Sequence, residues 1–339
     1  MMIVNKAAVA VVGAVLTVTG FVGAAFALKD RAQNNPNNTE PVTTTYARPT
    51  KQTAPEQQSG DKKYKFRDDM EVILFMGTDE RKKIDDKDDE YVHYTQADAL
   101  YVFAIDHKNK TYQILQVNRD TMCDVKQILG IGEDDIASMQ VCLAHSYGKT
   151  EQARCLNVCD SVSGLICDVP IDHYVSLSML GIADFNDIVG GVTITMPGGL
   201  EDAYPDFKEG ISYTFKGKKA EDFLRARYLL KDDYNSSRMK RQELYMNAWK
   251  GQAIAKMQSD SEFPMKMVLA LSEYMTSDMT ANQLADLAKV LKDYKQLDSL
   301  TTTGEYLEEG DGRLFREFHV NEEDLHKKVI ELFYEEVPA

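Results

Sequence analysis

Residues 99–117 read ALYVFAIDHKNKTYQILQV, and this stretch decides the fold of the chain. Two apolar runs of strand length, 99–105 and 111–117, stand on either side of a polar HKNK turn. Two such runs joined by a short polar turn predict a β-hairpin. We therefore expect a sheet that is built outward from this hairpin.

Strands and helices alternate through the rest of the chain. An apolar run at 71–76 (EVILFM), which Gly77 closes, predicts a buried strand before the hairpin. Further strands are expected at 172–177, 192–196 and 313–320, and helices at 136–145, 151–165, 217–229, 237–257, 263–275, 281–294 and 322–334. Strands that interleave with helices indicate an α/β domain whose sheet is covered on both faces.

The N-terminal residues predict a membrane anchor. Residues 7–28, AAVAVVGAVLTVTGFVGAAFAL, are uncharged and long enough to cross a bilayer as a transmembrane helix. The alternative is a cleaved signal peptide, because Ala25-Phe26-Ala27 resembles an A-x-A cleavage site. The apolar cores of signal peptides usually run only about 7–15 residues, however. We favour an uncleaved anchor, with residues 1–6 in the cytoplasm and the remainder exported.

A segment with almost no large apolar residues follows the anchor. Residues 32–60 are rich in Asn, Thr, Gln and Pro, and such a composition cannot bury enough surface to fold. We therefore expect a disordered extracellular tether over 29–65. A folded domain is expected over 66–257, with a helical and strand segment packed on it over 258–339.

The charge of the chain restricts its partners. Its 339 residues carry a formal net charge of −15. A nucleic-acid binder would carry a basic face, so we expect no nucleic-acid partner. An anionic substrate must instead be captured locally, by arginine side chains or by a metal ion.

All five cysteines fall in one central region of the chain: Cys123, Cys142, Cys155, Cys159 and Cys167. Outside the cytoplasm, an odd number implies at least one thiol without an intramolecular partner. The Cys155-x3-Cys159 spacing suggests zinc, but no CxxC pair or His-x3-5-His pair completes such a site. We expect small core residues or one or two disulfides.

Polar residues with ligand chemistry flank three of the predicted strands. Asp79 comes just after the first strand, Asp98 just before the second, and Arg119 directly after the third. Two carboxylates that converge on one edge of a sheet can hold Mg²⁺ together with waters and substrate phosphates. Arg119 either pairs with an acid such as Asp120 or binds a ligand. Arg81 is a candidate phosphate ligand in the same loop as Asp79, for which the alternative is a turn that caps a helix.

Four further arginines gather in FLRARYLLKDDYNSSRMKRQ, residues 223–242. Between residues 225 and 241, six basic side chains stand against two acidic ones, a local charge of +4 in an acidic chain. Guanidinium groups are planar and match phosphate oxygens bidentately, so the stretch predicts a phosphate or pyrophosphate subsite. The alternative is an exposed helix face with ion pairs three or four residues apart.

Taken in order, these segments resemble the LytR-CpsA-Psr family of cell-wall glycopolymer ligases. The resemblance covers about residues 66–257 and includes the anchor and the tether. The segments that carry it are GTDER, ADALYVFAIDHKNKTYQILQVNRDT, IDHYVSLSMLGIADFNDIVGGVTITMP, GKKAEDFLRARY and DDYNSSRMKRQ. The resemblance implies a central mixed β-sheet covered by helices on both faces, with an apolar tunnel for a lipid chain.

The resemblance also implies a reaction. Members of the family transfer a glycopolymer, such as a wall teichoic acid or a capsular polysaccharide, from a polyprenyl-pyrophosphate carrier to peptidoglycan at the outer face of the membrane. The family's magnesium-associated acids fall on Asp79 and Asp98, so Mg²⁺ is the implied cofactor. Asp98, as a general base, and Arg119 are the implied catalytic residues. The positions that match pyrophosphate-binding residues are Arg81, Gln96, Arg119, Arg225, Arg227, Arg238, Arg241 and Gln242.

One position departs from the family pattern. Two residues before Asp98 the family usually has an arginine, and this chain has Gln96. A neutral amide can donate a hydrogen bond to a phosphate oxygen but adds no charge, which Lys82 or Lys83 can supply instead.

Two other functions would use the same residues. One is a phosphatase acting on polyprenyl pyrophosphates, and the other is a non-catalytic envelope regulator that binds lipid-linked wall precursors.

Overall fold

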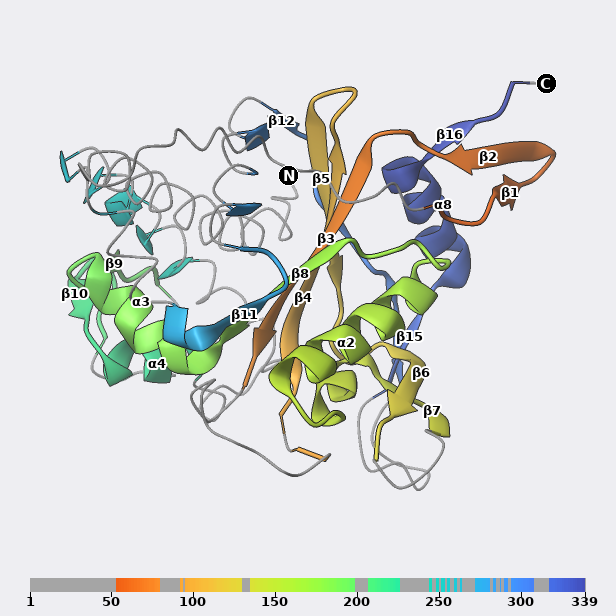
Figure 1. Cartoon of the computed structure of the whole chain (residues 1–339). Helices are drawn as coiled ribbons and strands as arrows, with labels where there is room; N and C mark the ends of the chain where they lie inside the picture. Colours follow the sequence, from red (N-terminus) through yellow and green to blue (C-terminus); the bar gives the residue numbers. More distant parts are fainter. Residues whose placement is uncertain are drawn as a thin grey trace, which may run out of the picture. The chain divides into compact units, whose positions relative to one another are not determined.

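A computed structural model describes the fold (Figure 1). The described residues are 53–79, 92–93, 95–129, 135–198, 207–225, 272–280, 294–307 and 317–338, with separate positions between 244 and 291. They belong to two compact units, which divide at residues 179/180 and 273/274. The larger unit contains the residues before and after these boundaries, and the smaller unit contains the residues between them.

The larger unit is built on a mixed sheet in which the strand order is β11-β8-β3-β4-β5-β12, with β13 also paired to β5. Both β3/β4 and β4/β5 are antiparallel, whereas β3/β8 and the pairs of β5 with β12 and β13 are parallel. The strands are β3 (Met70–Thr78), β4 (Ala97–Asp106), β5 (Thr111–Val117), β8 (His173–Ser178), β11 (Met275–Ser277), β12 (Lys295–Gln296) and β13 (Leu300–Thr301). The predicted hairpin and the strands expected at 71–76 and 172–177 are thereby confirmed.

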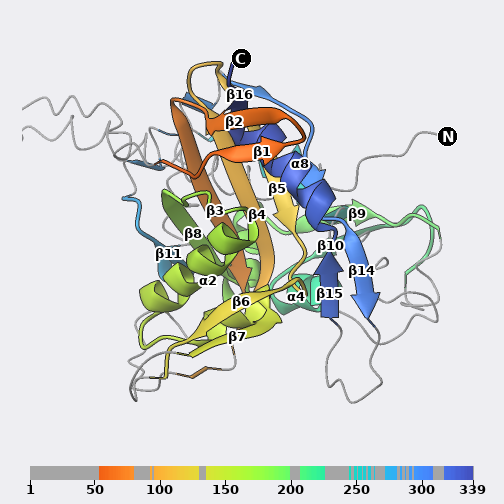
Figure 2. The ribbon, with the colours of Figure 1, turned by 90° about the vertical axis from the view of Figure 1, so that its right-hand side faces the viewer.

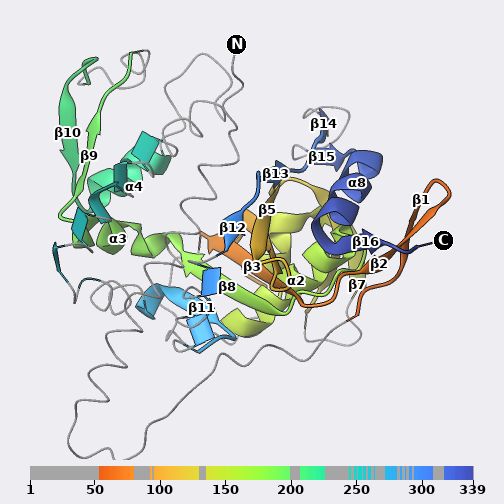
Figure 3. The same ribbon diagram turned by 90° about the horizontal axis from the view of Figure 1, so that it is seen from above.

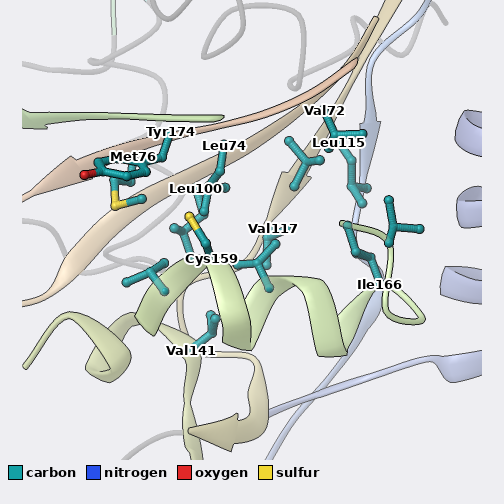
Figure 4. Packing of buried hydrophobic residues seen from close by; sticks show 14 of the residues in the cluster. Val72, Leu74, Met76, Leu100, Leu115, Val117, Val141, Cys159, Ile166 and Tyr174 are labelled. Carbon is teal, nitrogen blue, oxygen red and sulfur yellow. The ribbon is translucent and has the colours of Figure 1, made fainter. Parts of the chain in front are cut away.

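Alternate residues of these strands point to opposite faces of the sheet. On one face, Val72, Leu74 and Met76 form an apolar cluster with residues of α2 (Glu151–Leu165), among them Cys159 (Figure 4). Residues of α8 (Glu322–Phe333) belong to the same cluster. Residues of the opposite face are equally buried, among them Ile73, Phe103, Ile105 and Ile114. The α/β fold with a central mixed sheet is confirmed, and both of its faces are buried.

Each of these two helices begins at a polar residue that caps it. Thr150 accepts a hydrogen bond from the backbone N–H of Ala153 at 3.1 Å, and Asn321 accepts one from that of Asp324 at 2.9 Å. Such caps satisfy backbone donors that have no partner within the helix. The helices expected at 151–165 and 322–334 are confirmed, the second ending one residue earlier than expected.

The helix expected at 136–145 was a wrong prediction. Residues Asp135–Gln140 form strand β7, which pairs with β6 (Met122–Gln127), and the 3₁₀ helix η1 (Val141–Ser146) follows. Apolar residues at 136, 137 and 139 satisfy a helical pattern over so short a window as well as a strand pattern. The pairing with β6 decides between them, and we did not predict β6.

Part of the range that we expected to be a disordered tether is folded. Strands β1 (Gln57–Ser59) and β2 (Lys62–Phe66) lie within or overlap the range 29–65, and β2 pairs with β16 (Tyr334–Glu336) (Figure 2). Lys62 and Lys65 form ion pairs with Glu336 and Glu335 at 2.8 and 2.9 Å. Their polar composition gave no sign of a strand, and the partner that stabilises β2, β16, lies at the far end of the sequence. The boundary at 257/258 stays a prediction, although β11, β12 and β13 of the later segment belong to the central sheet.

The smaller unit packs a helix pair beside a hairpin (Figure 3). Phe185 stacks on Trp249 with ring centroids 4.0 Å apart, and Asn186 Oδ1 accepts a hydrogen bond from Tyr245 Oη at 3.0 Å. The strand expected at 192–196 is confirmed, and so is the start of the helix expected at 217–229. The elements of the smaller unit are α3 (Ile182–Ile188), β9 (Val192–Thr195), β10 (Ser212–Phe215) and α4 (Lys218–Arg225). The 3₁₀ helix η2 (Met179–Gly181) directly precedes α3.

Three shorter elements complete the described structure: η3 (Ser272–Tyr274), β14 (Gly304–Leu307) and β15 (Glu317–Val320). The last of these confirms the end of the strand expected at 313–320. Within the part of the chain that the structure describes, none of the helices combines the length and apolar character that a bilayer crossing requires. The anchor expected at 7–28 and most of the helices expected at 237–257, 263–275 and 281–294 lie outside the described residues.

Asp172 predicts a pH dependence of stability. Burial raises the pKa of its carboxyl to about 6, against the hydrogen bond that it accepts from the backbone N–H of Val72 at 2.8 Å. The folded chain then binds this proton more tightly than the unfolded chain, so stability falls as pH rises from about 4 to 6. We expect Asp172→Asn to stabilise the protein at pH 7.5 by about 1 kcal/mol, because an amide keeps the acceptor and loses the charge. Melting temperatures measured from pH 4 to 8 check this: the gap between variant and wild type should widen with pH, and a constant gap contradicts it.

Candidate functional site

Three strand ends meet at one end of the central sheet. Because β4 runs antiparallel to both β3 and β5, its first residues lie beside the last residues of each neighbour. The register pairs Thr78 with Ala97 and Leu100 with Val117. Side chains that follow β3 and β5 are thereby brought to those that begin β4.

Asp79 follows an irregularity in β3. The pairing register with β4 shifts between Gly77 and Thr78, and such a bulge re-aims the side chains beside it. The backbone N–H of Asp79 donates to the carbonyl of Gln96 at 3.0 Å, and the backbone N–H of Gln96 donates to Asp79 Oδ1 at 2.6 Å. These reciprocal bonds hold the Asp79 carboxylate beside Gln96 and the start of β4.

Arg119 contacts three side chains at this end of the sheet. Its Nη1 forms an ion pair with Asp98 Oδ1, and its Nη2 donates to Gln96 Oε1 at 2.5 Å. Its Nε donates to Asp120 Oδ1 at 3.3 Å. The structure therefore brings together Asp98, Gln96 and Arg119, with Asp79 linked through Gln96, and the ligand roles assigned to these residues stay predictions.

Asp120 has partners that the sequence did not reveal. Its Oδ1 accepts a hydrogen bond from Gln140 Nε2 and its Oδ2 accepts one from Tyr306 Oη, both at 3.2 Å. Gln140 ends β7, and Tyr306 lies on β14, 186 residues after Asp120. No local pattern in the sequence indicates a contact over such a separation.

A buried polar network holds the segment before Asp98. His145 is fully buried, with Nδ1 3.0 Å from Thr95 Oγ1 and Nε2 3.0 Å from Glu151 Oε1. Thr95 is further fixed by bonds from its hydroxyl to the carbonyl of His145 and from Ser146 Oγ to its own carbonyl. Thr95 directly precedes Gln96, so this network positions the entry to β4.

Glu151 is the charged centre of that network. Its Oε2 lies 2.5 Å from Arg154 Nη2, and both side chains are about nine-tenths buried. Burial alone raises the pKa of Glu151, but the hydrogen bond and charge of His145 and the charge of Arg154 outweigh it and lower the pKa to about 2. The carboxylate is therefore ionised throughout the neutral range and compensated by its two partners.

The ligand atoms of His145, Glu151 and Cys155 lie within 4.8 Å of one another, a spacing that suits a metal ion. Two observations oppose that role. Arg154 and His145 already occupy the Glu151 carboxylate, and burial raises the pKa of the Cys155 thiol well above its ordinary value. Because the Glu151 carboxylate is already paired with Arg154 and His145, we assign this group to structure.

The five cysteines are free thiols, and Cys142, Cys155 and Cys159 are buried in the core. Cys142 lies close to the candidate site, because its backbone N–H donates to the carbonyl of Arg119 at 3.2 Å. Burial raises the pKa of its thiol to about 12, with Arg119 acting against burial and Asp120 and Asp79 acting with it. Cys142 is thus a core residue and no thiolate nucleophile.

Most of the predicted arginines fall where the structure describes no side chains. Arg225 ends α4, but the structure does not describe its side chain. The other predicted phosphate ligands of this kind lie wholly outside the described residues: Arg81, Arg227, Arg238, Arg241 and Gln242. Lys82 and Lys83 are outside as well. Their roles stay predictions. The described charged side chains at the strand ends are three carboxylates and the Arg119 guanidinium, which sum to −2.

A comparison with protein families bears on this arrangement. The model of the LytR_cpsA_psr family matches residues 38–329. The chain belongs to this family. The match includes all three strand ends described above, and it confirms the resemblance on which the site residues were chosen.

Individual relatives of this chain share less than a third of its residues over the matched regions. A polyisoprenyl-teichoic acid–peptidoglycan teichoic acid transferase TagU of Halalkalibacterium halodurans is 29% identical over 155 residues, which cover 46% of this chain and 44% of the relative. The chain thus spans less than half the length of that protein. The TagU of Bacillus cereus strain AH820 is 26% identical over 245 residues, 71% of each chain. The crystal structure of protein gbs0355 from Streptococcus agalactiae shares the fold, with a TM-score of 0.56 and 19% identity over 77% of this chain and 87% of that one.

Proposed function

We propose that this protein is an extracytoplasmic phosphotransferase that moves a glycopolymer from a polyprenyl-pyrophosphate carrier to peptidoglycan. The observation that carries the proposal is the meeting of Asp79, Gln96, Asp98 and Arg119 at one end of the sheet in a member of the LytR_cpsA_psr family. The TagU relatives, named as teichoic acid transferases that act on peptidoglycan, support the same class of reaction. The anchor predicted at 7–28 would keep the domain at the membrane, where the carrier lies.

The proposed reaction is a phosphoryl transfer. A hydroxyl of peptidoglycan attacks the phosphorus that bears the sugar, and a P–O bond forms to the acceptor oxygen. The P–O bond to the bridging oxygen breaks, and polyprenyl phosphate leaves. Negative charge on the non-bridging and leaving oxygens is stabilised by Arg119 and by the arginines of 223–242, because guanidinium groups aimed at developing charge lower the barrier.

A carboxylate must accept the proton of the attacking hydroxyl. We assign this role to Asp98, whose Oδ1 forms an ion pair with Arg119 Nη1. Base and cation are therefore held against each other at the strand ends. A hydroxyl bound beside Asp98 would also lie beside the guanidinium that contacts the phosphate.

Magnesium fits the chemistry of these residues. Asp79 and Asp98 offer hard carboxylate oxygens, which are the ligands that Mg²⁺ prefers. The described charged side chains at the strand ends sum to −2, so a pyrophosphate needs additional positive charge there. Mg²⁺ held by Asp79 and Asp98 would supply that charge to the phosphate oxygens. The role of Asp98 as a metal ligand would compete with its role as the base, so the oxygen that binds the metal cannot be the one that accepts the proton.

The transfer assay uses the purified protein, a polyprenyl-pyrophosphate-linked glycopolymer and isolated peptidoglycan. We expect glycopolymer attached to peptidoglycan and an equal amount of polyprenyl phosphate. Free glycopolymer with a phosphate end would instead identify a phosphatase. Tight binding of the lipid without any product would identify a non-catalytic binding protein.

Removal of the metal provides a separate test of the two aspartates. We expect EDTA to slow transfer at least tenfold and added Mg²⁺ to restore it, because the strand ends then lack the charge that offsets the pyrophosphate. Asp79→Asn should raise the Mg²⁺ concentration needed for half-maximal rate. A rate that is the same with and without EDTA would remove Asp79 and Asp98 from any metal-binding role.

A further inference from the structure

The hairpin of β14 and β15 reaches the loop that carries Arg119. The hydroxyl of Tyr306, on β14, lies 3.2 Å from Asp120 Oδ2 and 3.3 Å from Asn118 Oδ1, and it accepts a hydrogen bond from Asn118 Nδ2 at 2.9 Å. A phenol has one proton to donate. The carboxylate is the stronger acceptor, so the proton goes to Asp120 and the amide of Asn118 donates to the phenol oxygen.

Asp120 in turn contacts the guanidinium at Nε, whereas Asp98 and Gln96 contact it at Nη1 and Nη2. Asp120 Oδ1 accepts a hydrogen bond from Arg119 Nε, while Arg119 Nη1 forms an ion pair with Asp98 and Nη2 donates to Gln96. A guanidinium is a rigid plane, so fixing Nε fixes the direction of both Nη groups. Neutral donors, Tyr306 and Gln140, hold the other positions of the Asp120 carboxylate.

We propose that Tyr306 is a positioning residue of the site, which acts through Asp120 to orient the Arg119 guanidinium toward the phosphate. This deepens the proposed function and rests on Arg119 as its phosphate ligand. Without the phenol hydroxyl, Asp120 Oδ2 loses a donor and the carboxylate rotates toward Arg119. The guanidinium is then drawn away from Asp98 and Gln96.

The role assigned to Tyr306 is separate from the attachment of the hairpin. The backbone N–H of Phe318 on β15 donates to the carbonyl of Asp120 at 2.9 Å, and Thr121 forms a bridge with Phe318. The Tyr306 ring packs against that of Phe318 with centroids 5.0 Å apart. Tyr306→Phe keeps all of these contacts and removes only the hydroxyl, so the hairpin stays in place.

The test measures binding of geranylgeranyl pyrophosphate in the presence of Mg²⁺ by titration calorimetry. We expect Arg119→Ala to weaken binding roughly tenfold to a hundredfold and Tyr306→Phe roughly threefold to tenfold. In an Asp120→Ala background, Tyr306→Phe should weaken binding no further, because Tyr306 acts on Arg119 only through the Asp120 carboxylate. The matched control is Tyr112→Phe, since Tyr112 donates to Gln296 Oε1 at the opposite end of β5. It should bind as wild type does.

The transfer reaction gives a second readout. Tyr306→Phe should lower kcat roughly fivefold and leave the KM for peptidoglycan unchanged, because Arg119 stabilises charge that develops on the phosphate in the transition state and not the binding of the acceptor. Equal melting temperatures of Tyr306→Phe and wild type are part of the expected result.

Unchanged binding by Tyr306→Phe alongside weak binding by Arg119→Ala overturns the inference and leaves the proposed function intact. Wild-type binding by Arg119→Ala, or none by the wild-type protein, overturns both. Equal effects of Tyr306→Phe with and without Asp120 also overturn the inference.

Discussion

Arg119→Ala is expected to reduce transfer by about 10²–10³-fold while the domain stays folded, because a cation aimed at developing charge is among the largest catalytic contributions. Its guanidinium contacts Asp98, Gln96 and Asp120, which come from three different segments of the chain. No other described cation takes part in these contacts. The measurement is the initial rate of glycopolymer attachment to peptidoglycan.

The chain offers a matched control for this variant. Arg67 Nη1 forms an ion pair with Asp106 Oδ2 at 2.9 Å, at the opposite end of β4 from Asp98. The Arg67 and Arg119 side chains are 20% and 21% exposed, so each substitution removes a comparably buried guanidinium from an aspartate of the same strand. Arg67→Ala should lower the melting temperature and keep the rate per folded molecule. Equal rates for the two variants would remove Arg119 from the mechanism.

Glu151→Gln is expected to cost about 3 kcal/mol of the free energy of unfolding at pH 7, because it leaves the buried Arg154 guanidinium without its counter-charge. The lowered pKa of Glu151 fixes the pH dependence of the effect. Its ionised form stabilises the fold fully above the unfolded value of 4.5, and the contribution is lost as pH falls toward about 2. The gap between wild type and variant should therefore close in acid.

Urea unfolding at pH 7 and at pH 3 measures this change. The control is Glu323→Gln, which removes an exposed carboxylate paired with Lys327 one helical turn away. Exposed pairs contribute little, so this variant should unfold as wild type does. A Glu151→Gln protein as stable as wild type at pH 7 would show that the network around His145 does not hold the fold. The network also positions Thr95, so we expect slower transfer from the folded Glu151→Gln variant.

The sequence was sufficient for the strands that read as continuous apolar runs and for the residues beside them. Asp79, Asp98 and Arg119 each flank such a run, and the hairpin between 99 and 117 requires the strand ends beside Asp98 and Arg119 to meet. The place of Asp79 beside them depends on the pairing of β3 with β4, which we did not predict. The pairing of Arg119 with Asp98 was not predictable, because a position at a sheet edge does not fix which of several acids a guanidinium contacts.

The contacts that the sequence did not reveal are those between distant segments. Tyr306 and Gln140 reach Asp120 from strands that no local pattern identified as its neighbours. β7 read as a helix because its partner strand was missing from the prediction. β2 read as a tether because its stabilising partner, β16, follows almost the whole of the described chain. Period and composition report local preference, and tertiary pairing overrides it in each of these cases.

The parallel pairing of β5 with β12 and β13 has a consequence for synthesis. A ribosome completes β5 at residue 117, but the strands that cover its outer edge end only at residue 301. At about 5–20 residues per second, the interval between them is roughly 10–40 s. During that time the nascent hairpin presents an unpaired apolar edge, which is the kind of surface that joins other chains. Until its own later strands arrive, the newly made protein is open to pairing with another chain at this edge.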